Sequence, residues 1–136
     1  MHHARQIQKF RTDGKTASPE RLIVLLYERL GRDLDEACAA IEAGEAERRH
    51  TALLHAQEII EELSYAVNTD IWPEGEGLIA LYDYLLDLLV RANIQADLAP
   101  IAEASKTVND LADAWRAAYV ELATTSTAND PAASAV

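Results

Sequence analysis

Histidine and glutamate at helical spacing are the side chains of this sequence that could hold a pair of metal ions. In a helical bundle, that site needs two Glu-x-x-His pairs on two helices and one inward Glu on each of the others. The sequence contains one such pair, Glu47 and His50, and no histidine follows His55. His55 lies five residues after His50, which turns it about 140° away from that residue on a helix. We therefore expect no metal site and no cofactor.

Catalytic patterns built on serine, cysteine or histidine do not stand out either. His2 and His3 stand beside Met1 at the start of the sequence, where they could chelate copper only adventitiously. Cys-His, Ser-His-Asp and glycine-rich phosphate-binding patterns are not evident. The single cysteine, Cys38, cannot form an internal disulfide, and we interpret it as a small core residue rather than a reactive thiol. We expect no enzyme.

The charge of the chain excludes other classes of protein. A formal net charge of −11 argues against nucleic acid as a partner, because phosphate binding needs a basic face. No apolar run approaches the roughly 20 residues of a membrane span, and residues 1–17 contain no signal-peptide core. We expect a soluble cytoplasmic protein without a membrane partner. Residues 1–17 carry a local charge of +3, so they could lie on the acidic body or stay solvated.

The clearest helix signal in the sequence begins at Ser18. Ser18 is a typical N-cap, Pro19 suits the first helical position, and Glu20 lies in the first turn. Apolar residues then recur at helical spacing, which predicts one buried face. Gly44 is the expected end of this helix.

Three further helices are expected, joined by short turns, over residues 45–68, 76–95 and 97–122. Asp97 is the expected N-cap of the last helix, with Pro100 in its first turn. Four helices of similar length with short connections favour an all-α, antiparallel four-helix bundle spanning residues 18–122. A mobile N-terminal arm, 1–17, and a disordered C-terminal tail, 123–136, complete the expected organisation.

Two of these helices carry more apolar surface than one buried face needs. Leu22, Val24 and Leu25 fall outside the main apolar arc of the first helix, and the helix over 76–95 has an apolar arc of about 200°. One interpretation is tight packing, with the loops and the arm covering the surplus. The other is a groove that accepts amphipathic helices from a partner. Ile7 and Phe10, which would share a face of a helical turn, could plug that groove.

The order of several short motifs resembles that of the flagellar export chaperones that bind flagellin, the FliS family. The stretch TASPERLI followed by LLY is similar to the family signature TASPxxLIxxLYxG. Further blocks in the family's order are Ala43-Gly44-Glu45, AQEIIEEL over 56–63, LYDYL over 81–85 with LVRAN over 89–93, and Asp113-Ala114-Trp115. The resemblance covers about residues 10–118.

This resemblance implies a small four-helix bundle that is not an enzyme. It implies a cytoplasmic chaperone that binds the C-terminal helical region of flagellin and prevents its premature polymerisation. It further implies delivery to the flagellar type III export apparatus, with contacts to the export gate and other flagellar regulators. An alternative remains open, in which the chain is a structural or regulatory bundle that self-associates through its second apolar face.

The residues expected to line the partner-binding groove come from the first and third helices. They are Leu22, Ile23, Leu25, Leu26, Tyr27, Ile79, Tyr82, Leu86, Val90 and Asn93. Ile7 and Phe10 are the expected anchors of the arm.

Overall fold

The computed structural model describes residues 18–128, which contain four α-helices and no strand. The helices are α2 (Pro19–Ala43), α3 (Ala46–Tyr65), α4 (Gly75–Gln95) and α5 (Leu98–Ala128). The all-α fold expected from the sequence is therefore confirmed. The expected arm, 1–17, and residues 129–136 of the expected tail lie outside the described part of the chain.

Both ends of α2 have the caps that the sequence predicts. The side chain of Ser18 accepts a hydrogen bond from the backbone N–H of Arg21 at 3.1 Å, and Pro19 opens the helix. Gly44 ends it with φ 70°, a left-handed conformation that glycine adopts without the clash of a Cβ atom. Local chemistry is sufficient to define this helix.

The ends of α3 and α5 differ from their expected positions. α3 ends at Tyr65 rather than near residue 68. The side chain of Asn68 instead accepts hydrogen bonds from the backbone N–H groups of Asp70 and Ile71 at 3.1 and 3.4 Å, which turns the chain toward α4. α5 begins after Asp97 as expected but continues to Ala128, beyond the end expected at residue 122.

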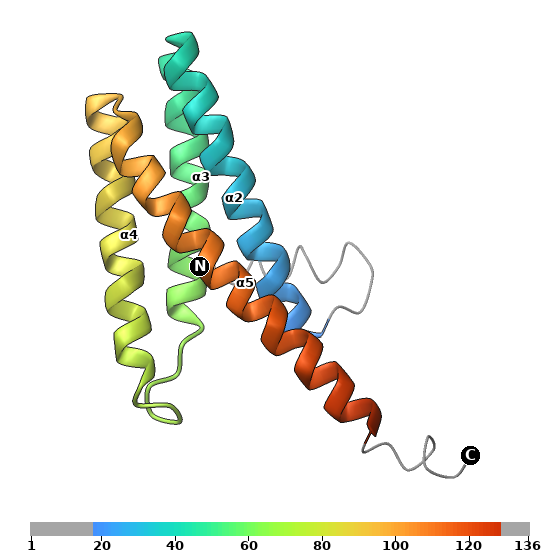
Figure 1. The fold of residues 1–136 in the computed structure, drawn as a ribbon. Coiled ribbons are helices and arrows are strands. Elements are labelled where there is room, and N and C mark those ends of the chain that lie inside the picture. The colour runs from blue at the N-terminus through green and yellow to red at the C-terminus, as the bar shows by residue number, and fades with distance from the viewer. Residues whose placement is uncertain (1–17, 129–136) are drawn as a thin grey trace.

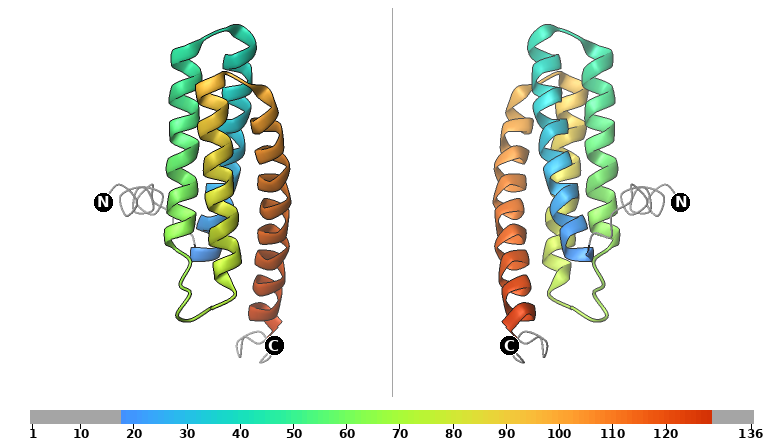
Figure 2. Two further views of the ribbon diagram at one scale, coloured as in Figure 1. Left: turned by 90° about the vertical axis from the view of Figure 1, so that its left-hand side faces the viewer. Right: turned by 90° about the vertical axis from the view of Figure 1, so that its right-hand side faces the viewer.

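The four helices form a ring in which each helix packs against two neighbours. α2 and α4 each pack against both α3 and α5. Within the described residues, no Cα atoms of the diagonal pairs, α2 with α4 and α3 with α5, lie within 8 Å of each other. Figure 1 shows α5 running obliquely to the other helices, and Figure 2 shows the short connections at the two ends of the bundle. The order is that of an antiparallel up-and-down bundle.

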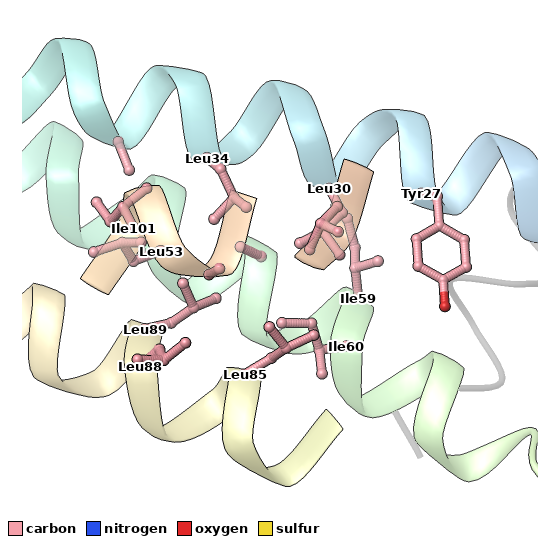
Figure 3. Packing of buried hydrophobic residues seen from close by; sticks show 14 of the residues in the cluster. Tyr27, Leu30, Leu34, Leu53, Ile59, Ile60, Leu85, Leu88, Leu89 and Ile101 are labelled. Carbon is pink, nitrogen blue, oxygen red and sulfur yellow. The ribbon is translucent and has the colours of Figure 1, made fainter. Parts of the chain in front are cut away.

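Aliphatic side chains from all four helices fill the space inside the ring (Figure 3). The largest of the fully buried apolar residues are Tyr27, Tyr82, Leu30, Leu34, Leu53, Ile59, Ile60, Leu85, Leu88, Leu89 and Ile101. Burial of a leucine or isoleucine side chain contributes roughly 1.5–3 kcal/mol, so this core is the main source of stability. It also holds the four helices at fixed positions around the site described next.

Candidate functional site

An apolar cavity of about 220 Å³ lies between the start of α2, the end of α3, the start of α4 and the middle of α5. It is lined by Ile23, Leu63, Ala66, Val67, Asn68, Ile71, Trp72, Leu78, Tyr82 and Trp115. Pockets for small molecules usually measure roughly 300–1,000 Å³. The size and lining of this cavity therefore suit one or two apolar side chains of a partner better than a small-molecule ligand.

Two tyrosines form a buried polar pair beside this cavity. The hydroxyl groups of Tyr27 and Tyr82 are hydrogen-bonded to each other in the interior. Burial raises the pKa of Tyr27 above its ordinary value, an effect that interactions with Tyr82 and Trp115 partly oppose. Burial is also the main cause of the raised pKa of Tyr82, followed by its proximity to Tyr27. Both phenols therefore stay neutral at physiological pH.

The mouth of the cavity depends on a glycine. Gly75 opens α4 and is buried; a Cβ atom there would lie 2.6 Å from Cγ1 of Val67 and 3.0 Å from Cε3 of Trp72. Trp72 and Val67 can pack this closely only because residue 75 has no side chain. Ile71, next to Trp72, has 82% of its surface exposed although it contributes to the cavity lining. The connection between α3 and α4 thus presents apolar side chains at the cavity entrance.

A second apolar surface follows the side of α4 that faces α3. Asn93 marks this side: its amide oxygen accepts a bond from Nε of Arg49 at 3.2 Å, and its amide nitrogen donates to Nδ1 of His50 at 3.0 Å. Leu86 and Ile79 precede Asn93 by two and four turns, so they lie within about 40° of it around the helix axis. We call the residues of this surface the α3–α4 flank: Ile79, Leu86, Val90 and Asn93 of α4 with Leu54 of α3.

Leu54 belongs to the flank because of the register between the two helices. α3 and α4 are antiparallel, and Asn93 contacts Arg49 and His50, so one turn along each helix brings Leu54 beside Val90. Leu54 and Val90 are 42% and 41% exposed, which is high for large aliphatic residues. The flank therefore offers apolar side chains to the surroundings.

The ten residues expected to line a groove occupy several environments. Leu22, Leu26, Tyr27 and Tyr82 are buried; Ile23, Leu25, Ile79, Leu86 and Asn93 are partly buried; and Val90 is exposed. The expected arm anchors, Ile7 and Phe10, lie outside the described residues. Only the partly buried and exposed members are accessible to a partner in this conformation.

The two sets of expected groove residues meet at one place rather than along their length. α2 and α4 are diagonal neighbours in the ring, separated by α3 on one side and α5 on the other. Ile23 of α2 and Tyr82 of α4 both line the cavity, and Tyr27 reaches Tyr82 through the interior. Ile79, Leu86 and Val90 face α3 instead, so they continue the accessible surface away from α2.

Several cavity residues were not among those singled out from the sequence. Trp72 lies in the connection between two expected helices, while Leu78 and Trp115 lie on expected helices but outside the expected groove. One signal was present: the chain has only two tryptophans, and one of them lies in a connection, directly before Pro73. A tryptophan in such a segment usually packs on something, because its large apolar surface is costly to expose.

A larger and more open pocket of about 730 Å³, lined mainly by charged residues, lies between α2 and α3. Its charged lining residues mostly pair with one another. Asp33, which is buried, contacts Nδ1 of His55 and lies 3.5 Å from Nε of Arg29. Arg48 contacts Glu36 and Glu45, and these partners raise its pKa above the ordinary value. Because these charges are already compensated, this pocket has little to offer a charged ligand.

The described residues carry no arrangement suited to metal chemistry. Within 18–128, no group of three or more His, Cys, Asp or Glu could hold a metal ion. Cys38 is partly buried against the core, and burial, followed by the nearby Asp35 and Glu42, raises the pKa of its thiol. Little thiolate therefore forms at neutral pH, which agrees with a core role.

No helix of the described region is long and apolar enough to cross a membrane.

The bundle, the apolar cavity and the accessible flank define a small helical-bundle protein whose apolar sites suit protein segments. Comparison with known proteins assigns it to a family: the model for "Flagellar protein FliS" matches residues 1–122, and the chain belongs to the FliS family. The resemblance stated from the sequence motifs is thereby confirmed. The family is one of chaperones, which also confirms that the chain is not an enzyme.

Curated relatives agree over most of the chain. The flagellar secretion chaperone FliS of Bacillus subtilis (strain 168) is 38% identical over 103 residues, which are 76% of this chain and 77% of that protein. The flagellar secretion chaperone FliS of Salmonella typhimurium is 31% identical over 104 residues, 74% of this chain and 76% of its own length. A third relative, the flagellar secretion chaperone FliS of Escherichia coli (strain K12), is 27% identical over 103 residues.

Proposed function

We propose that the chain binds the C-terminal helical region of flagellin in the cytoplasm, prevents its premature polymerisation and delivers it to the flagellar type III export apparatus. Membership of the FliS family supports this role, since the curated relatives are named flagellar secretion chaperones. The export gate and other flagellar regulators are proposed as further partners on the same basis.

The observation that carries the proposal is the accessible apolar surface that runs from the cavity to the α3–α4 flank. Leu78 lines the cavity, and the next residue, Ile79, begins the flank that continues through Leu86 to Val90. An amphipathic helix is recognised by apolar anchors spaced at three, four and seven residues. A client helix lying along α4 could place one anchor in the cavity and others against Leu86 and Val90.

Coupled folding explains how such a chaperone could bind its client and still release it. A client segment that is disordered when free must become ordered on binding, and this entropic cost lowers the affinity below what the buried area suggests. Burial of the client's apolar face also removes the surface through which it would associate with other copies. Both properties are needed of a protein that holds a subunit only until export.

The test is calorimetric titration of the chain with the isolated C-terminal segment of flagellin. We expect a one-to-one complex with a negative heat-capacity change and a gain of helicity. The variant Leu86→Glu should lower the affinity by at least about tenfold, because it buries a charge in the contact. Leu98→Glu is the matched control, since Leu98 is exposed at the first residue of α5, where a carboxylate favours the helix.

Two results would contradict the proposal. One is the absence of heat and of any gain in helicity at high micromolar concentration of the segment. The other is an equal effect of Leu86→Glu and Leu98→Glu on binding. If the chain also shows a mass that rises with its own concentration in the absence of flagellin, self-association through the α3–α4 flank becomes the better account of that surface.

A further inference from the structure

Charge is distributed unevenly around the cavity and the α3–α4 flank. Between Arg49 and Arg91 the sequence has no lysine or arginine. The same stretch carries eight carboxylates: Glu58, Glu61, Glu62, Asp70, Glu74, Glu76, Asp83 and Asp87. This stretch makes up most of α3, the connection and most of α4, so the accessible apolar surface lies in the most acidic part of the bundle.

Four of these carboxylates are exposed and have no ion-pair partner among residues 18–128: Asp70, Glu74, Glu76 and Asp83. We call them the acidic set. Some carboxylates elsewhere are paired; Arg116, for example, lies 2.9 Å from Asp113 and 3.7 Å from Glu28. Others among the described residues, such as Asp35 and Glu42 of α2, are exposed and unpaired like the acidic set, but the acidic set differs in lying on a stretch of chain that has no lysine or arginine.

The acidic set lies along the apolar surface. Asp70 precedes Ile71, and Glu74 is two residues after Trp72, so both accompany the mouth of the cavity. Glu76 and Asp83 of α4 are one turn or less from Ile79, on the side of the helix that carries the α3–α4 flank. Apolar residues and uncompensated carboxylates therefore occur together at the cavity mouth and at the first two turns of the α3–α4 flank.

We propose that this surface selects client helices that carry lysine or arginine beside their apolar anchors. The inference rests on the proposed function and specifies the chemistry of the client at the same site. A basic helix would supply the missing counter-charges as its apolar face docks. A neutral or acidic helix with the same anchors would partly desolvate the carboxylates without a partner, and an acidic one would also be repelled.

The expected contribution is larger for the association rate than for the final affinity. Exposed ion pairs contribute only about 0–1 kcal/mol each. A patch of one sign raises the association rate of an oppositely charged partner, and this effect falls as salt is added. The selection should therefore be strongest at low ionic strength.

Two synthetic helical peptides test this inference against the full-length chain. They share one apolar pattern and differ only in carrying lysine or glutamate at the flanking positions. Fluorescence anisotropy should show at least about tenfold tighter binding of the lysine peptide at low salt, with the difference shrinking as salt is raised. The flagellin C-terminal segment is measured in parallel, so that failure of the proposed function is recognised separately.

Matched pairs of neutralising substitutions locate the effect. Glu76→Gln with Asp83→Asn should slow association of the lysine peptide about three- to tenfold. Asp35→Asn with Glu42→Gln changes the net charge equally at exposed positions on α2 and should leave the rate within about twofold.

Each outcome decides a different claim. Equal slowing by both pairs would mean that only the net charge of −11 matters, and the inference would be overturned. Equal binding of the two peptides would overturn it as well, even if the flagellin segment binds. Discrimination between the peptides without binding of the flagellin segment would support the charge selection and contradict the proposed function.

Discussion

Tyr27 and Tyr82 are hydrogen-bonded through their hydroxyl groups although their helices occupy opposite corners of the bundle. Tyr82 also lines the apolar cavity, together with Trp115 of α5. The pair of phenols therefore links two diagonal helices through the interior and contributes to the wall of the candidate site.

Removing either hydroxyl should destabilise the bundle. Tyr82→Phe and Tyr27→Phe should each lower the free energy of unfolding by about 1–2 kcal/mol, because each leaves a buried polar group with one partner fewer. The double variant should cost less than the sum of the two, with a coupling energy of about 0.5–1.5 kcal/mol. Urea denaturation of the parent protein, the two single variants and the double variant measures this coupling energy. Strict additivity would show that the two hydroxyls do not stabilise each other.

Stability should fall at alkaline pH. Burial raises the pKa of both Tyr27 and Tyr82 above the value of 10.0 that the unfolded chain would show. The two protonated phenols contribute fully to the free energy of unfolding below pH 10. This contribution is lost as the pH rises above 10, because the unfolded state then releases protons that the folded state retains. The free energy of unfolding should therefore decrease with pH from about 10 upward.

Thermal denaturation between pH 8 and pH 11 checks this dependence. The variant with both tyrosines replaced by phenylalanine is the control, and its stability should decrease less over the same range. If the two proteins lose stability in parallel, ionisation of these phenols is not the cause.

A methyl group at residue 75 should disturb the site. Gly75→Ala would place Cβ 2.6 Å from Cγ1 of Val67, so the connection must shift at a cost of about 1–3 kcal/mol. Trp72 should move with it, and binding of the flagellin segment should weaken. Circular dichroism with urea, tryptophan fluorescence and calorimetry measure the three effects.

Gly77→Ala is the matched control for that change. A Cβ at Gly77 meets nothing within 4 Å, and alanine favours a helix over glycine by about 1 kcal/mol. This variant should be as stable as the parent or more stable, with unchanged binding. If Gly75→Ala and Gly77→Ala have the same stability and bind the flagellin segment equally well, close packing at Gly75 does not shape the cavity.

Two helix ends have a left-handed residue, so glycine should be more stable than alanine at both of them. Ala96 ends α4 with φ 49°, a left-handed conformation that costs a residue with a Cβ about 1–2 kcal/mol. Ala96→Gly should raise the free energy of unfolding by about 0.5–1 kcal/mol, since glycine's greater freedom in the unfolded chain offsets part of the gain. Gly44→Ala, at φ 70°, should lower it by about 1 kcal/mol. Urea denaturation of both variants checks the signs, and a change of the same sign at both positions would contradict this reasoning.

The sequence predicts the helices well where the signal is local. Ser18, Pro19 and Gly44 mark the ends of α2, and Asp97 marks the start of α5, because caps act through the nearest few backbone groups. The end of α3 was missed because the side chain of Asn68 bonds the backbone ahead of it and competes with the helix. The fold class follows from the periodicity and the short connections.

The candidate site was only partly accessible to the same reasoning. The apolar surplus on α2 and α4 was recognised, and Ile23 and Tyr82 do line the cavity. Periodicity states which residues of a helix prefer to be covered, but it does not say which helix covers them. Trp115 was not singled out for this reason, and Trp72 was not singled out because it lies in a connection, where no helical period applies.

The fold class, most helix ends and the family can be predicted from the sequence, because these depend on local spacing and on motif order. The diagonal placement of α2 and α4 in the ring is visible only in the folded chain, and it makes their apolar residues meet in one cavity rather than along a shared groove. The physical reason is that packing around a ring joins residues far apart in sequence, and no local pattern records that arrangement.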